Sequence, residues 1–125
     1  MPLLLDTCII YAWMMDRIKD YSIIELILNE GALVSSIAVW EMAIKNGLGR
    51  MPLPTSQIAE QIESQGFQWL NITPRHTQAI MELPTHHKVP FDRLLIAQEK
   101  YESLRVITYD SIFKNYLNDA LIIKK

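Results

Sequence analysis

Four acidic residues lie where apolar segments meet turns or helices, and their carboxylates could bind a metal ion. Asp6 and Asp110 each follow an apolar run of strand length. Asp92 opens an apolar helix, and Glu41 lies inside another one. Because these acids occupy the edges of elements that are far apart in sequence, they predict one shared pocket. Oxygen atoms are the preferred ligands of hard divalent cations, so such a pocket would suit a metal of that kind.

Three of the four acids also have an ordinary structural explanation. Asp6 could cap a helix that begins at Thr7, and Asp110 could cap one that begins at Ser111. Asp92 could favour the positive end of its own helix. For each of these three acids, the sequence leaves both the structural and the metal-binding explanation open.

Glu41 is harder to explain as a cap, because it lies beside the apolar stripe of its helix, four residues after Ile37. That stripe is expected to be buried and consists of Ile37, Trp40, Ile44 and Leu48. A carboxylate buried without a partner is costly and tends to take up a proton. A nearby cation would explain Glu41, and so would a buried partner such as Arg93 or Lys45.

Strands and helices are expected to alternate along the chain. The expected strands cover residues 2–5, 32–34, 67–72, 105–108 and 120–123. The expected helices cover residues 7–15, 21–29, 73–83, 91–103 and 111–116, with two more capped by Ser35 or Ser36 and starting at Thr55 or Ser56. This alternation of buried strands and helices predicts an α/β fold with a parallel sheet covered on both faces. Ligands of such sheets bind outside the carboxyl ends of the strands, where Asp6 and Asp110 are expected.

Composition sets the broad class of the protein. The chain has 125 residues, half of them hydrophobic, which predicts a single domain over residues 1–125. No apolar run is long enough to span a membrane, and a single cysteine, Cys8, fits a reducing cytoplasm. The net charge of −2 argues against a generally basic nucleic-acid binder. Setting the four acids aside leaves ten acidic against twelve basic residues, so a phosphodiester substrate is not excluded.

Other side chains carry weaker predictions. A zinc site of Cys8, His86 and His87 would match no known zinc spacing, so these histidines are expected in a solvated loop or beside the substrate path. Cys8 is expected to be a small buried residue. The tryptophans are expected in the core rather than stacked on bases: Trp13, Trp40 and Trp69.

Four segments of the chain resemble those of PIN-domain proteins, most closely the VapC-type toxins of bacterial toxin–antitoxin pairs. These segments are 3–7, 34–45, 90–98 and 106–110, and they occur in the family's order across essentially the whole chain. The resemblance implies a three-layer α/β/α domain with a central parallel sheet of four to five strands. It also implies an endoribonuclease that depends on Mg²⁺ or Mn²⁺.

The resemblance assigns roles to particular residues. The family's catalytic and metal-binding acids match Asp6, Glu41, Asp92 and Asp110, and its supporting hydroxyl residue matches Thr108. We expect direct metal ligation mainly from Asp6 and Asp92, because Mg²⁺ uses few protein carboxylates. Asp110 and Glu41 would hold metal-bound waters, complete a second metal site or position the nucleophile.

Several nearby residues complete these expectations. Arg93 is expected to pair with an acid of the site. Val89 stands where relatives often carry a further acid, a departure that bears on loop contacts rather than on the four acids. Lys45, Arg50 and Lys88 could contact RNA phosphates, although ordinary solvent-exposed charge explains them as well.

The resemblance further implies a homodimer and a small antitoxin protein that places a basic side chain among the four acids. The first two helices are rich in large apolar residues, which fits an interface, whereas a monomer with these residues in its core is the alternative. A catalytically inactive PIN-fold binding module is the main rival function. A phosphorelay receiver or a haloacid-type phosphatase would need further acids near the first strand, where the chain has Thr7 and Cys8.

Overall fold

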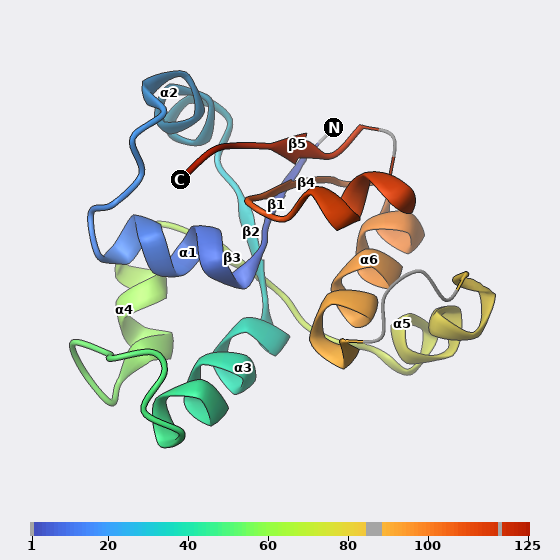
Figure 1. Cartoon of the computed structure of the whole chain (residues 1–125), viewed down its shortest axis with the longest axis horizontal. Coiled ribbons are helices and arrows are strands. Elements are labelled where there is room, and N and C mark those ends of the chain that lie inside the picture. The colour runs from blue at the N-terminus through green and yellow to red at the C-terminus, as the bar shows by residue number, and fades with distance from the viewer. Residues whose placement is uncertain (1, 85–88, 118) are drawn as a thin grey trace.

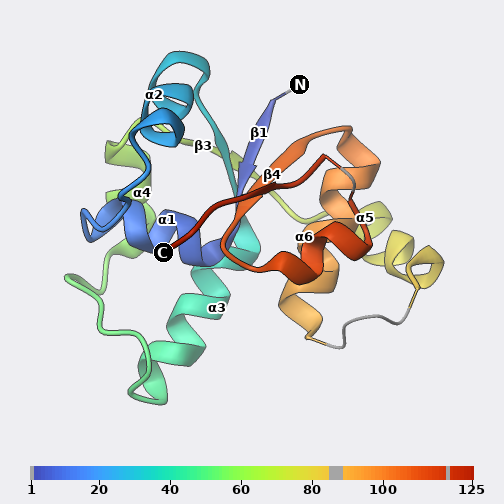
Figure 2. The ribbon, with the colours of Figure 1, turned by 45° about the horizontal axis from the view of Figure 1, so that its top comes forward.

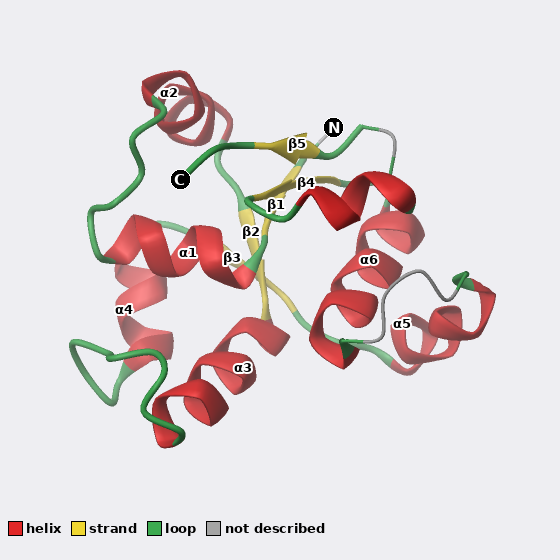
Figure 3. Ribbon diagram, viewed as in Figure 1, coloured by secondary structure: helices red, strands yellow, loops and turns green. Residues whose placement is uncertain are grey.

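A five-stranded parallel sheet forms the centre of the protein in the computed structural model, which describes residues 2–84, 89–117 and 119–125 (Figures 1 and 3). The strand order is β3-β2-β1-β4-β5, and every neighbouring pair is parallel. The strands are β1 (Leu3–Leu5), β2 (Leu33–Ser35), β3 (Gln68–Leu70), β4 (Arg105–Thr108) and β5 (Leu121–Ile122). The expected parallel sheet is therefore confirmed.

The apolar strands are covered on both faces because successive side chains point in opposite directions. In β1, Leu3 and Leu5 enter one hydrophobic core, whereas Leu4 enters the other. β4 repeats this division, with Ile107 in the first core and Val106 in the second. Leu4 is opposite Val106 across the β1–β4 ladder, so the two strands present matching faces.

Helices form a layer on each face of the sheet, which gives the expected three-layer α/β/α fold. Figures 1 and 2 show α1 (Thr7–Met14), α2 (Tyr21–Glu30) and α4 (Ile58–Ser64) together on one side. α5 (Pro74–Ala79) and α6 (Pro90–Glu102) lie on the other side. α3 (Ser36–Gly47) starts directly at the end of β2, so it extends from the carboxyl edge of the sheet.

Local sequence explains two of the helix ends. Gly31 follows α2 with φ 72°, a left-handed conformation that glycine adopts without steric cost. Thr73 caps α5 ahead of Pro74, and its hydroxyl accepts from the N–H of His76. The ring of His76 accepts in turn from the N–H of Thr73, which completes a capping box.

Several expected boundaries are corrected. The helix expected from Thr55 or Ser56 begins at Ile58, because the hydroxyl of Thr55 accepts from the N–H of Gln57 and holds a turn there. The helix expected to reach residue 83 ends at Ala79 and continues as the 3₁₀ helix η1 (Ile80–Glu82). The segment after Asp110 is also a 3₁₀ helix, η2 (Ser111–Asn115), and the strands expected over 67–72 and 120–123 are shorter.

The buried face of α3 differs from the expected stripe. Its buried residues are Ile37, Ala38, Glu41 and Met42. Trp40 is 58% exposed, Ile44 38% and Leu48 63%, so the expectations for these three residues were wrong. Because α3 meets the sheet only at its edge, contacts with α1 and α6 decide which face is covered. Trp40 packs edge-on against Phe91 of α6, with ring centroids 5.1 Å apart, instead of entering the core.

None of the helices in the described residues is long and apolar enough to cross a membrane.

Candidate active site

The four acids singled out in the sequence line one pocket of about 500 Å³, which we call the acidic pocket. It lies at the carboxyl edge of the sheet, since Asp6 directly follows β1 and Asp110 comes two residues after β4. The acids are joined in its lining by Cys8, Lys45, Val89, Tyr109, Ser111 and Lys125. Parallel strands end at the same edge, and this brings residues more than 100 positions apart into one site.

Asp6 is the most constrained of the four acids. It is buried, and the N–H of Thr7 donates to its Oδ1 at 2.8 Å, which is the expected helix cap. The hydroxyl of Thr108 donates to its Oδ2 at 2.7 Å. Burial raises the pKa of Asp6 from 3.8 to about 7, the Thr108 hydrogen bond opposes the rise, and the charges of Asp92 and Glu41 add to it. Asp6 therefore caps α1 and also faces other carboxylates.

Glu41 is buried as expected, and it has a protein partner. The Lys45 ammonium lies 2.6 Å from its Oε2, one helical turn further along α3. Partial burial acts to lower the pKa of Lys45, but the hydrogen bond and charge of Glu41 outweigh it and raise that pKa. Of the two explanations for a buried Glu41, the structure thus shows the ion pair with Lys45. Lys45 remains about one-third exposed, so a competing cation could still reach the pair.

Asp110 and Asp92 lie at the more open part of the acidic pocket. The Asp110 side chain accepts from the N–H of Ile112 at 3.0 Å, so it caps η2 as expected. Asp92 is in the first turn of α6, where the helix dipole favours a negative charge. Asp110 as a helix cap and Asp92 at a helix start therefore have ordinary structural roles, and both residues also line the acidic pocket.

Thr108 connects two of the acids. Its hydroxyl donates to Asp6 and accepts from the backbone N–H of Asp110 at 3.0 Å. Arg93 donates to the carbonyl oxygens of Pro84 at 2.9 Å and Ile80 at 3.4 Å, and so holds the segment after α5 against α6. Its pairing with an acid of the site stays a prediction.

The donor set of the acidic pocket consists of carboxylate oxygens, which fits a hard cation such as Mg²⁺ or Mn²⁺. The effect of Asp92 and Glu41 on the pKa of Asp6 indicates excess negative charge that a cation would offset. Within the described residues, no three Asp, Glu, His or Cys side chains are already arranged to hold a metal ion. Mg²⁺ commonly keeps several waters and takes only one or two carboxylates, so a complete protein cage is not needed.

Cys8 is partly buried rather than fully buried, and it lines the acidic pocket. Burial and the charge of Asp6 raise the pKa of its thiol to about 11. The thiol therefore stays protonated near neutral pH, and a thiol is a poor nucleophile in that form. His86, His87 and Lys88 lie outside the described residues, so their expected roles stay predictions.

Sequence reasoning missed three residues that line the acidic pocket: Tyr109, Ser111 and Lys125. Tyr109 and Ser111 flank Asp110, and this adjacency to a strand-end acid was the available signal. Lys125 has no such signal, because it is distant in sequence from the four acids and only the tertiary structure brings it to the acidic pocket.

The sequence matches the PIN domain over residues 3–123. The chain belongs to the PIN-domain family. No curated protein sequence matches this PIN domain at a significant level.

Solved structures of similar fold include two DNA-bound VapBC complexes and FitAcB. VapBC2 from Rickettsia felis, bound to a DNA fragment from its promoter, shares 20% identity with a TM-score of 0.67, covering 99% of this chain and 98% of that one. DNA-bound VapBC from Salmonella typhimurium shares 13% identity with a TM-score of 0.70 and the same coverage. FitAcB from Neisseria gonorrhoeae shares 18% identity with a TM-score of 0.67, covering 97% and 96%. At these identities the likeness establishes a common PIN fold.

Proposed function

We propose that this PIN domain, comprising residues 1–125, is a divalent-metal-dependent endoribonuclease and the VapC-type toxin of a toxin–antitoxin pair. One observation carries the proposal. Asp6 is buried at the end of β1, and Glu41, Asp92 and Asp110 line the same pocket. Burial, with a further contribution from the charges of Asp92 and Glu41, raises the pKa of Asp6 to about 7. Crowded carboxylates are costly unless a cation offsets them, and a cation among carboxylates is what phosphodiester cleavage requires. PIN domains of VapC toxins are nucleases, and this supports the reaction class.

The chemistry would divide between the bound cation and the side chains. When bound, Mg²⁺ or Mn²⁺ supplies neutralisation of a phosphate oxygen and a lower pKa for a coordinated water. Asp6 and Asp92 would hold it. Thr7 and Thr108 fix the Asp6 carboxylate through one hydrogen bond to each oxygen, so that ligand is oriented in advance.

Glu41 and Asp110 would act around that centre. Glu41 is held by Lys45, and it could share a cation or position the attacking water once this ion pair loosens. Asp110 is fixed by its cap of η2 at the opposite side of Thr108, where it could hold a metal-bound water. These assignments remain part of the proposal.

RNA cleavage by the purified protein tests the proposal directly. We expect cleavage of single-stranded RNA with Mg²⁺ or Mn²⁺ and none with EDTA. Asp6→Asn should abolish it, whereas Glu60→Gln on the outer surface of α4 should not. Cleavage by Asp6→Asn at the wild-type rate would show that the nuclease belongs to a contaminant or to another site.

The second candidate is an inactive PIN-fold binding module, and the Lys45–Glu41 ion pair favours it, because the ammonium already occupies one carboxylate of the pocket. The same assay separates the two. An inactive module would bind RNA or protein but leave RNA intact with either metal.

The proposed toxin would act in the cytoplasm on cellular RNA and would be inhibited by a cognate antitoxin. The solved relatives are VapBC complexes, and FitAcB is a further structure of this fold. An antitoxin arginine could pair with two carboxylates of the acidic pocket at once and exclude the metal. Expression of the chain should arrest growth, and co-expression of the neighbouring small gene should relieve the arrest. Persistent arrest would remove the antitoxin assignment for that gene.

A further inference from the structure

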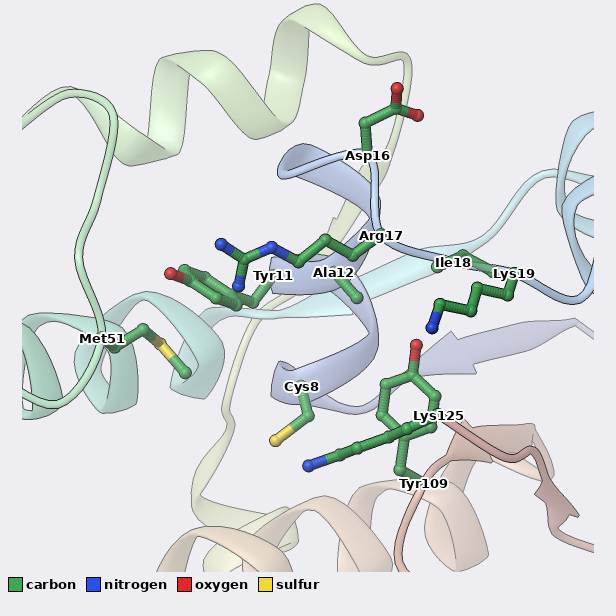
Figure 4. Close-up of a pocket in the computed structure, with 10 residues that line it drawn as sticks. All are labelled: Cys8, Tyr11, Ala12, Asp16, Arg17, Ile18, Lys19, Met51, Tyr109 and Lys125. Atoms are coloured by element: carbon green, nitrogen blue, oxygen red, sulfur yellow. The ribbon is translucent and has the colours of Figure 1, made fainter.

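A second pocket, of about 600 Å³, lies beside the acidic pocket and is lined by basic and aromatic side chains (Figure 4). We call it the basic pocket. Its cations are Arg17, Lys19 and Lys125, and its aromatic residues are Tyr11 and Tyr109. We infer that the basic pocket binds one nucleotide of an RNA strand whose scissile phosphate lies in the acidic pocket. This inference rests on the ribonuclease function proposed above.

The two pockets adjoin, because Cys8, Tyr109 and Lys125 line both of them. A strand placed across Tyr109 would therefore pass directly from one to the other. Negative phosphates are disfavoured among the four acids until a cation is bound, but they are attracted to the basic pocket in either state. The surface is thus negative at the acidic pocket and positive at the basic pocket. This arrangement suits an RNA strand that is cleaved at one phosphate and bound through the neighbouring phosphates.

The cations of the basic pocket are available for phosphate. Arg17, Lys19 and Lys125 are exposed, and none of them forms a salt bridge with another described residue. Among the described residues that line the basic pocket, Asp16 is the only acid, and Figure 4 shows it pointing away from the other labelled side chains. The interior of the pocket is thus net positive.

The local fold explains why Arg17 points back into the pocket. Asp16 has φ 57°, which turns the chain sharply after α1, and the N–H of Arg17 then donates to the carbonyl of Ala12 at 2.8 Å. This turn places the Arg17 guanidinium over the Tyr11 ring, 5.9 Å from its centroid. Lys125 occupies the matching position over Tyr109, also at 5.9 Å.

The aromatic rings give the pocket surfaces on which a base can stack. Tyr11 is fixed, because its hydroxyl donates to the carbonyl of Pro52 at 2.7 Å. Each ring has a cation over it, so a base that stacks on the ring in place of the cation would leave that cation to bind the phosphate of the same nucleotide. The pocket volume lies within the range of about 300–1,000 Å³ that is usual for small-molecule sites.

The test compares two double variants that remove the same charge. Arg17→Ala with Lys19→Ala changes the basic pocket, whereas Lys100→Ala with Lys114→Ala changes exposed lysines that line neither pocket. Binding of a fluorescein-labelled single-stranded RNA would be measured by anisotropy in EDTA, where no cleavage occurs. We expect the first double variant to bind roughly tenfold more weakly. The slope of log affinity against log salt concentration should become shallower by about 0.7 for each phosphate contact that is lost. The control should bind like the wild type.

Cleavage kinetics give an independent readout. The Arg17→Ala/Lys19→Ala variant should raise KM while leaving kcat nearly unchanged, because it removes binding that is common to the ground and transition states. Equal weakening in both double variants would show diffuse electrostatic attraction and overturn the inference. So would wild-type RNA affinity accompanied by loss of binding to the antitoxin, which would assign the pocket to a protein partner.

The outcomes also separate this inference from the proposed function. If the wild-type chain cleaves RNA and the basic-pocket variant has the same affinity and KM, the ribonuclease function is supported and the nucleotide site is refuted. If the wild-type chain neither binds nor cleaves RNA, the proposed function itself falls.

Discussion

At the scale of single residues, the environment of Asp6 has two opposing effects on its carboxylate. Its carboxylate is held by Thr7 and Thr108, yet burial and neighbouring acids disfavour its charge. A group kept in place at such a cost is a candidate for function, because functional sites are where perturbed carboxyl groups concentrate.

The first prediction concerns Asp6→Asn. The wild-type protein should gain thermal stability when Mn²⁺ is added, because the cation binds the folded state. The variant should show little gain, and without metal it should be as stable as the wild type or more stable at about pH 8, since it removes one repelling charge. Differential scanning fluorimetry with and without Mn²⁺ measures both effects. An equal metal-induced shift in the variant would remove Asp6 from the ligand set.

The second prediction concerns Lys45→Ala. Its ammonium pairs with a buried Glu41, so its loss leaves that carboxylate without its cation and should cost about 1–3 kcal/mol in metal-free stability. The same change removes positive charge from the acidic pocket, and Mn²⁺ should then bind several-fold more tightly. Urea unfolding in EDTA and metal titration by calorimetry measure the two effects. Weaker Mn²⁺ binding would indicate that Lys45 helps to build the site instead of competing for Glu41.

At the scale of elements, the pair α5 and α6 is held by polar groups that are unusual in a core. His76 is fully buried, and its Nε2 lies 2.8 Å from a carboxylate oxygen of Glu102 on α6. Because its Nδ1 accepts from the N–H of Thr73, Nε2 carries the hydrogen and donates to Glu102. One ring therefore caps α5 and also ties it to α6.

The third prediction follows from this arrangement. His76→Ala removes the capping contact and leaves a cavity, and it should cost about 2–4 kcal/mol. Arg75→Ala, an exposed neighbour in the same helix, should change stability little. Urea denaturation compares the two variants. Equal stability losses would show that α5 is sensitive to any substitution and that the buried ring has no special role.

The fourth prediction concerns Glu99 on α6, which faces Asp119. Burial raises the pKa of Glu99 from 4.5 to about 7, and the charge of Asp119 and a hydrogen bond with it add to the rise. The folded protein thus favours the protonated carboxyl, and this stabilisation is present below about pH 4.5 and lost as pH rises to about 7.

Glu99→Gln stays neutral, so it should melt at a higher temperature than the wild type above about pH 7, with the difference vanishing near pH 4.5. Melting temperatures across this pH range measure the effect, with Glu60→Gln on α4 as an exposed control. A difference that does not change with pH would contradict the assignment.

At the scale of the whole molecule, the large apolar residues of α1 and α2 are weaker evidence for a dimer than the sequence suggested, because several of them are buried. Ile9 and Ile23 are buried in the core, and Trp13 is packed against it. Tyr21 and Leu28 of α2 remain 80% and 68% exposed. The homodimer therefore stays a prediction that rests mainly on the family.

The fifth prediction tests that association. Sedimentation equilibrium at tens of micromolar protein should give twice the chain mass of 14.5 kDa. Tyr21→Ser should shift this equilibrium if α2 takes part, because large exposed apolar side chains commonly mark interfaces. A monomer at that concentration would remove the dimer claim and leave the proposed chemistry unaffected.

The sequence alone determined the fold class and the location of the acids. Buried strands that alternate with helices leave few topologies other than a covered parallel sheet. Once the strands are parallel, residues that follow them, such as Asp6 and Asp110, must meet at one edge. These conclusions depend on local pattern and chain direction, both of which can be read without knowing any contact.

Only the tertiary structure decided which side chains face one another at that edge. The sequence left Arg93 and Lys45 open as partners of Glu41, and the structure shows Lys45, one turn further along the same helix. The packing of α3 against α1 and α6 decides that Glu41 itself is buried. The same packing exposes Trp40, which the helical pattern had assigned to the core. The basic pocket joins Arg17 to Lys125 across almost the whole chain. Periodicity reports a residue's neighbours along its own element, whereas these contacts depend on how separate elements approach each other.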